Sequence, residues 1–286
     1  MRSRTADGDP VTAPAAPGEP VVDQLAEVWS SLIGACGQLD GGEWDLPTDC
    51  PGWSVKDNLS HLVGIERMLL GDPAPPRPAE VPPHVANEFG EMNEAWVDSR
   101  RPVPGPAVLA EFAETTGRRL GALSAMSADD WDEVGWSPVG EVPYRQFMET
   151  RVLDTWAHEQ DIRRAVGRPG GRDGPGEATA LDRCERTMPY VVGKRVAPPD
   201  GSSVLFNVTG ALGRQIVVTM DGGRALPGPA PPPDPPIVEL AMDQETFWRL
   251  GFGRVAAAEV LASGRVSVRG DTGIGRRVVE SMSFMI

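Results

Sequence analysis

Apolar residues recur every three or four positions through much of the first 170 residues, a spacing that places them on one face of an α-helix. Ser54 is placed to cap one such helix, with Asp57 three residues on, and Pro143 to start another. Four main helices separated by one long crossover are typical of a four-helix bundle. The main helices are predicted over residues 22–39, 54–70, 108–123 and 144–166, with a shorter one over 85–99.

Segments rich in turn-forming residues separate these helices. Residues 72–83 hold many prolines and are predicted to be an extended linker, and residues 131–143 are predicted to be a loop. The connector 44–54 carries two tryptophans, which is unusual for a solvated loop, so it is expected to be ordered and packed. Glycines and prolines over 167–176 end the bundle.

The pattern changes in the C-terminal half, where short runs rich in β-branched residues follow one more helical stretch. Two of these runs, separated by Gly210 and Gly213, predict a β-hairpin, and Asp243 is placed to cap a helix. Such a mixture is typical of an α+β domain. Helices are predicted over 178–191, from 243 and from 271, strands over 203–209, 214–220, 237–242 and 265–269, and a proline-rich linker over 227–236.

The predicted fold class is therefore multidomain, α followed by α+β. Residues 20–170 are expected to form the helical bundle, and residues 176–286 the smaller α+β domain. Residues 1–19 contain small residues and prolines without the apolar core of a signal peptide, and a disordered leader is expected there.

Charge and cysteine content exclude several classes of partner. The formal net charge is −14, and no basic stripe is present to displace counterions from a phosphate backbone, so no nucleic-acid partner is expected. No uninterrupted apolar run approaches the ~20 residues of a transmembrane helix, so no membrane partner is expected. Cys36, Cys50 and Cys184 are scattered, which favours a reducing, cytoplasmic compartment over a disulfide framework.

Candidate chemistry lies in the predicted helix over 144–166. Asp154, His158 and Asp161 are spaced four and three residues apart, which places them along one face of that helix. The chain has only three histidines, and His61 lies in another predicted helix. One His from one helix with an acidic residue and a His from another can build a divalent-metal site with an open position. A solvated polar face, or hydrogen-bonded histidines in a core, would show the same spacing.

Two segments carry a resemblance to a known family. Residues 48–62, TDCPGWSVKDNLSHL, and residues 154–169, DTWAHEQDIRRAVGRP, resemble the two signature blocks of the mycothiol-dependent maleylpyruvate isomerase family. That family belongs to the DinB-like metal-binding bundles. The C-terminal half, with GRVSVRGD at 264–271, is similar to the sterol-carrier-like α+β domain that follows the bundle in these proteins.

The resemblance implies a divalent metal, zinc in most members, held by His61, Asp154 and His158. The isomerase has Glu at the acidic position, where Asp is shorter by one methylene, so either the helices approach more closely or a water intervenes. Glu66 and Asp161 are possible substitutes or partners that orient an imidazole. For Glu66 and Glu159 a solvated helix face is the preferred interpretation.

The implied activity is that of a metal-dependent isomerase or S-transferase. A zinc-bound thiolate, with mycothiol as the cosubstrate, would attack a small electrophilic substrate. The second domain would close the site, and Arg254 is the candidate catalytic residue that binds a substrate carboxylate, against the alternative of a surface arginine at a helix start. None of the three cysteines is placed like a nucleophile.

Two alternatives remain open from the sequence. The first is a zinc-dependent hydrolase in which bound water takes the open position. The second is a non-catalytic metal- or ligand-binding module. Metal content separates the second alternative from the enzymes, and thiol-dependent turnover separates the isomerase or transferase from the hydrolase.

Overall fold

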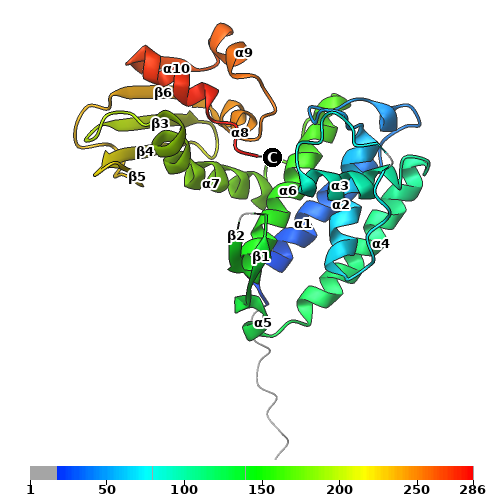
Figure 1. Ribbon diagram of the computed structural model, residues 1–286. Helices are drawn as coiled ribbons and strands as arrows, with labels where there is room; N and C mark the ends of the chain where they lie inside the picture. Colours follow the sequence, from blue (N-terminus) through cyan, green and yellow to red (C-terminus); the bar gives the residue numbers. More distant parts are fainter. Residues whose placement is uncertain (1–17, 79, 139, 286) are drawn as a thin grey trace, which may run out of the picture.

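The N-terminal part of the protein is a helical bundle (Figure 1). The computed structural model describes residues 18–78, 80–138 and 140–285, so the predicted leader over 1–19 lies almost wholly outside the described residues. The shorter α3 lies against α2, α1 packs on α4 and α6, and α2 packs on α4 and α6. The helices of the bundle are α1 (Pro20–Cys36), α2 (Val55–Leu69), α3 (Glu88–Asp98), α4 (Gly105–Ser124) and α6 (Tyr144–Ala165).

Helix α2 begins where the sequence predicts. The Ser54 side chain accepts a hydrogen bond from the Asp57 amide, and the Asp57 side chain accepts one from the Ser54 amide, which satisfies two amides at the helix start. Leu59 and Leu62 fill the bundle core, but the polar His61 of the same helix is buried as well. Helix α2 is thus embedded on nearly all sides, and its polar groups need partners inside the bundle.

The segment over 131–143 is not the loop that the sequence predicted. It holds the end of a short helix, α5 (Ala128–Asp132), and a hairpin of strands β1 (Val134–Ser137) and β2 (Gly140–Pro143). Gly140, at the start of the second strand, has φ 111°, a backbone conformation that glycine adopts readily and other residues rarely adopt. Strands of four residues are too short to show a clear alternation of apolar and polar positions, which explains the error.

The C-terminal part is an α+β domain, as the sequence predicted. Its five-stranded sheet has the order β5-β4-β3-β6-β7, in which only β3 and β6 pair in parallel. The short β5 and α9 had not been predicted. The strands are β3 (Ser203–Thr209), β4 (Arg214–Asp221), β5 (Arg224–Pro227), β6 (Val238–Asp243) and β7 (Ser267–Gly270), and the helices are α7 (Pro175–Tyr190), α8 (Gln244–Gly251), α9 (Ala257–Ala262) and α10 (Thr272–Glu280).

Helix α7 joins the two parts, because it packs on α6 and α1 of the bundle and on α8 of the second domain (Figure 1). Trp156 of α6 and Trp248 of α8 meet edge to face, with ring centroids 5.1 Å apart. The chain end returns to this junction, where the Phe284 amide donates to the Gly251 carbonyl at 2.9 Å. None of the helices in the described ranges combines the length and the apolar character that crossing a membrane requires.

Gly176 sets how closely α7 approaches α6. A Cβ at this position would lie 2.4 Å from the Trp156 ring. Gly176→Ala is therefore expected to lower the free energy of unfolding by about 1–3 kcal/mol, the usual cost of overpacking. Gly117→Ala is the control, because Gly117 is exposed in α4 with nothing within 4 Å, and a gain of about 0.5–1 kcal/mol is expected there. Urea unfolding measures both, and equal effects would contradict the role given to Gly176.

Candidate metal centre

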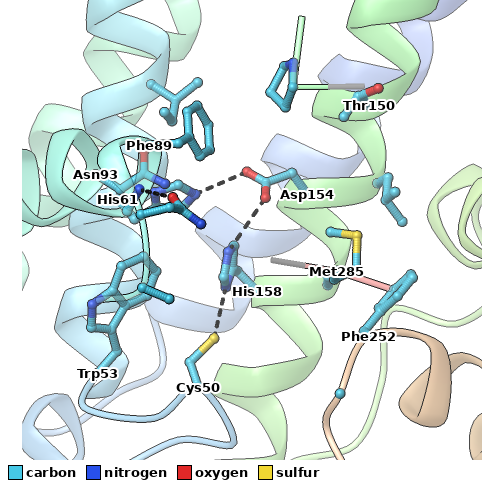
Figure 2. A pocket seen from close by; sticks show the side chains of 18 of the residues that line it. Cys50, Trp53, His61, Phe89, Asn93, Thr150, Asp154, His158, Phe252 and Met285 are labelled. Carbon is cyan, nitrogen blue, oxygen red and sulfur yellow. Dashed lines mark hydrogen bonds and ion pairs between the residues drawn. The ribbon is translucent and has the colours of Figure 1, made fainter. Parts of the chain in front are cut away.

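His61 of α2 meets Asp154 and His158 of α6 inside the bundle (Figure 2). The His61 Nε2 atom lies 3.2 Å from Asp154 Oδ2, and the His158 Nε2 atom lies 3.6 Å from Asp154 Oδ1. The two imidazole centroids are 4.9 Å apart. Asp154 thus reaches both rings directly despite its short side chain. The structure brings the three predicted ligands together, and their role as ligands stays a prediction.

Asn58 fixes the orientation of the His158 ring through a hydrogen bond at Nδ1. Its Nδ1 lies 2.7 Å from Asn58 Oδ1, and the Asn58 amide nitrogen donates to the Ser54 carbonyl at 2.8 Å. Because that carbonyl can only accept, the amide oxygen of Asn58 must face the ring, so Nδ1 of His158 carries a proton that it donates. The Nε2 atom of His158 then faces Asp154 and is the nitrogen left to bind a metal once its own proton is displaced, the arrangement that metal-binding histidines show.

Asp154 is held by a buried ionic network that the sequence reasoning missed. Arg151 Nη1 donates to Asp154 Oδ2 at 2.5 Å, and Arg151 Nε donates to Glu66 Oε1 at 2.9 Å. Arg119 Nε donates to the other oxygen of Glu66 at 3.0 Å. The predicted solvated face for Glu66 is therefore wrong, because its side chain is completely buried. The buried Glu66 carboxylate is stable there because its negative charge is compensated by the positive charges of the two arginines.

Glu159 was also predicted on a solvated face and is also buried. Its Oε1 atom accepts hydrogen bonds from Ser31 Oγ and Arg163 Nε, both at 2.7 Å, on the side of α6 that faces α1. Burial raises the pKa of Glu159 above its ordinary value. The residue ties α6 to α1 and takes no part in the histidine cluster.

Asp161 and Arg254 form a second ion pair beside His158. Arg254 donates to both oxygens of Asp161 at 2.9–3.1 Å, and Asp161 Oδ2 lies 3.3 Å from His158 Nδ1. Arg254 is thus not a surface arginine, and it comes from the second domain. The Cys50 thiol donates to Asp161 at 3.4 Å. It also lies 3.9 Å from His158 Nδ1 (Figure 2), a proximity that no sequence pattern had indicated.

The pKa values of the two imidazoles are shifted in opposite directions. Burial lowers the pKa of His61 below its ordinary value. Burial acts in the same direction on His158, but hydrogen bonds to Asp154 and Asp161 outweigh it and hold the pKa of His158 well above the usual range. Burial disfavours the ionised form of Asp154, yet the charges of Arg151 and His61 bring its pKa well below the ordinary value. A cation held by both rings must displace the proton on His158.

The cluster forms part of the wall of a cavity of about 480 Å³ where the two domains meet. Trp53, from the connector predicted to be packed, lies over both imidazoles, with ring centroids 5.0 Å from His61 and 5.8 Å from His158. Much of the wall is apolar, and the second domain contributes to it. Apolar lining residues are Ile65, Met68, Phe89, Trp136, Leu153, Phe252, Phe284 and Met285.

The donor set fits a divalent ion. Tetrahedral zinc with bonds of about 2.0–2.2 Å separates its ligand atoms by roughly 3.3–3.6 Å. The separations of 3.2 Å and 3.6 Å from Asp154 to His61 and His158 are close to that range. The buried Nδ1 of His61 lacks a partner among the described residues, so this ring is held by its Nε2 side alone. Two imidazoles and one carboxylate leave a fourth position toward the cavity.

Fold and site together define a helical bundle with a buried histidine–carboxylate cluster at its junction with an α+β domain. Residues 25–163 match the model of the mycothiol maleylpyruvate isomerase N-terminal domain, and residues 183–283 match the SCP-2 sterol transfer family. The chain therefore joins a segment similar to the mycothiol maleylpyruvate isomerase N-terminal domain to a segment similar to the SCP-2 sterol transfer family.

Other known proteins resemble the chain in fold or in sequence. The crystal structure of the mycothiol-dependent maleylpyruvate isomerase has a similar fold, with a TM-score of 0.53 and 15% identity over 88% of this chain and 93% of that chain. Uncharacterized proteins from two strains of Mycobacterium tuberculosis are 29% identical over 154 residues. That match covers 53% of this chain and 58% of the length of each relative.

Proposed function

We propose that the protein is a divalent-metal-dependent enzyme of the mycothiol-dependent isomerase or S-transferase type, with zinc as the ion. Its substrates would be a low-molecular-weight thiol, mycothiol, and a small electrophilic molecule. The observation that carries the proposal is the convergence of His61, Asp154 and His158 on one point of a cavity that both domains line. The match of residues 25–163 to the mycothiol maleylpyruvate isomerase N-terminal domain supports the choice of thiol.

In this proposal His61, Asp154 and His158 hold the ion. A divalent ion supplies a positive charge that lowers the pKa of a thiol, so that the thiol reacts as the nucleophilic thiolate. The protein's own contribution is positioning. Asn58 fixes the ring of His158 and Arg151 fixes the carboxylate of Asp154, so neither side chain needs to be ordered when substrate arrives.

The apolar wall of the cavity has a role in the same proposal. Trp53 covers the imidazoles from the bundle side, and Phe252 lies at the junction on the side of the second domain (Figure 2). Excluding water there strengthens electrostatic interactions and protects a reactive thiolate from competing proton transfer. A cavity of about 480 Å³ lies within the range of sites that bind small molecules.

Turnover in the presence and absence of thiol tests the proposal. The zinc-loaded protein is expected to isomerise, or add thiol to, conjugated carbonyl substrates only when mycothiol is present, as followed by ultraviolet absorbance and mass spectrometry. Glutathione is the comparison thiol. Metal-dependent turnover without any thiol would instead support the hydrolase, and a protein that binds no ion would support the non-catalytic module.

A further inference from the structure

Arg183 differs from the other arginines that line the cavity. Three arginines among the described residues do so, of which Arg151 is paired with Glu66 and Arg254 with Asp161. For the guanidinium of Arg183, on α7, the described part of the chain offers no ion pair and no hydrogen bond. Every other arginine in the wall is thus neutralised by the protein, and Arg183 is not.

The surroundings of Arg183 leave its charge uncompensated. Its side chain is half-buried, and burial together with the charge of Arg186 lowers its pKa, whereas the pKa values of Arg151 and Arg254 are raised. The nearby Glu149 pairs with Arg186 instead, at 3.6 Å. A guanidinium stays charged under all physiological conditions. A half-buried, unpaired cation is costly, and an anion entering the cavity would offset that cost.

The rest of the cavity limits what such an anion can be attached to. The wall contributed by the second domain includes Phe252, Phe284 and Met285. The lining carboxylates Glu94 and Asp154 already have cationic partners. A second anionic group on the ligand would find no further unpaired arginine or lysine among the described lining residues. The complementary ligand has one anionic group on an apolar body.

We propose that Arg183 is a substrate-binding residue that receives the carboxylate of an apolar carboxylic acid, whose body packs on Phe252 and Phe284. This inference rests on the proposed function, since it names the substrate class of the same site. It also replaces the sequence-based assignment of the carboxylate to Arg254, whose donors are taken by both oxygens of Asp161. The planar guanidinium of Arg183 is suited to a bidentate contact with a carboxylate.

Cinnamate and cinnamamide form a matched pair of probes, because both carry a conjugated chain and an apolar ring and only the acid is charged. Calorimetric titration of the full-length protein after removal of metal by EDTA excludes the ion as the anion-binding group. The wild type is expected to bind cinnamate about 10–100-fold more tightly than the amide, the usual worth of a charge-assisted hydrogen bond. Arg183→Met is expected to abolish this preference.

Three controls make the result specific. Arg183→Lys, which keeps the charge, is expected to retain part of the preference. Arg276→Met, at an exposed arginine of α10 outside this cavity, is expected to retain all of it. Titration with mycothiol is expected to give the same affinity in wild type and Arg183→Met. This result would show that Arg183 binds the carboxylate of the substrate and not a group of the thiol.

Equal binding of acid and amide by the wild type, no binding of cinnamate, or a preference that survives in Arg183→Met would overturn the proposal. A mycothiol affinity that falls as much as that for cinnamate would also do so. Because these titrations need neither metal nor turnover, their failure is distinct from failure of the thiol-dependent reaction.

Discussion

His158→Ala is expected to yield protein purified without its metal. The variant removes one of three ligands and also leaves Asn58 Oδ1 and Asp161 without the imidazole that they contact. Changes to residues that only orient a ligand cost about 10–100-fold in metal affinity, so loss of a ligand itself is expected to cost at least about 100-fold. Elemental analysis by mass spectrometry after dialysis measures the bound ion, and thermal unfolding is expected to occur at a lower temperature.

His84→Ala is the matched control for the metal content. His84 lines the same cavity, but its Nε2 lies 3.2 Å from Glu94 and it is not part of the cluster with Asp154. This variant is expected to keep a full equivalent of metal. Equal metal content in His158→Ala and His84→Ala would remove the basis for the proposed centre, whatever the two variants do to stability.

Helical spacing and the family resemblance were sufficient to predict the bundle, the α+β domain and the meeting of two histidines. The spacing of Asp154 and His158 fixes their common face once α6 is a helix, and that face meets His61 because both helices bury it. Periodicity gives the direction in which a side chain points. It does not give the partner that lies there, which is set by elements far apart in the chain.

Glu66 and Glu159 show where this limit lies. A carboxylate on a helix is ordinarily solvated, and only the tertiary structure reveals that arginines from other helices surround Glu66. The partner of Arg254 could not be predicted for the same reason, since its contact with Asp161 spans 93 residues. Cys50 reaches Asp161 through the fold of the connector, in which Trp53 also packs against the cluster.

The cavity beside the histidine cluster is lined by residues of both domains. The bundle supplies the candidate ligands, but the second domain supplies Arg254 and Phe252 to the walls, and α7 supplies Arg183. A bundle expressed alone would expose the imidazoles and lose the ion pair to Asp161. The SCP-2 domain is thus part of the cavity in this protein, in addition to any binding role of its own.

Glu66→Ala is expected to be the most destabilising single substitution among those considered. It leaves Arg119 and Arg151, whose side chains are 4% and 5% exposed, without the carboxylate that bridges them. Removing one partner of a buried ion pair typically costs about 3–5 kcal/mol, which in a protein of this size corresponds to a fall in melting temperature of about 10 °C. Among the described residues, Arg151 then keeps Asp154 as its one carboxylate partner and competes with the ion for it, so metal affinity is expected to fall as well.

Glu149→Ala provides the comparison, because Glu149 pairs with Arg186 on the surface, where both side chains are about half exposed. Its effect is expected to stay within about 0.5 kcal/mol. Differential scanning calorimetry of both variants, with and without added zinc, separates loss of the ionic network from loss of the ion. If Glu66→Ala unfolded at the same temperature as Glu149→Ala in metal-free protein, the buried network would not be holding α2, α4 and α6 together, and Asp154 would need another source of its fixed position.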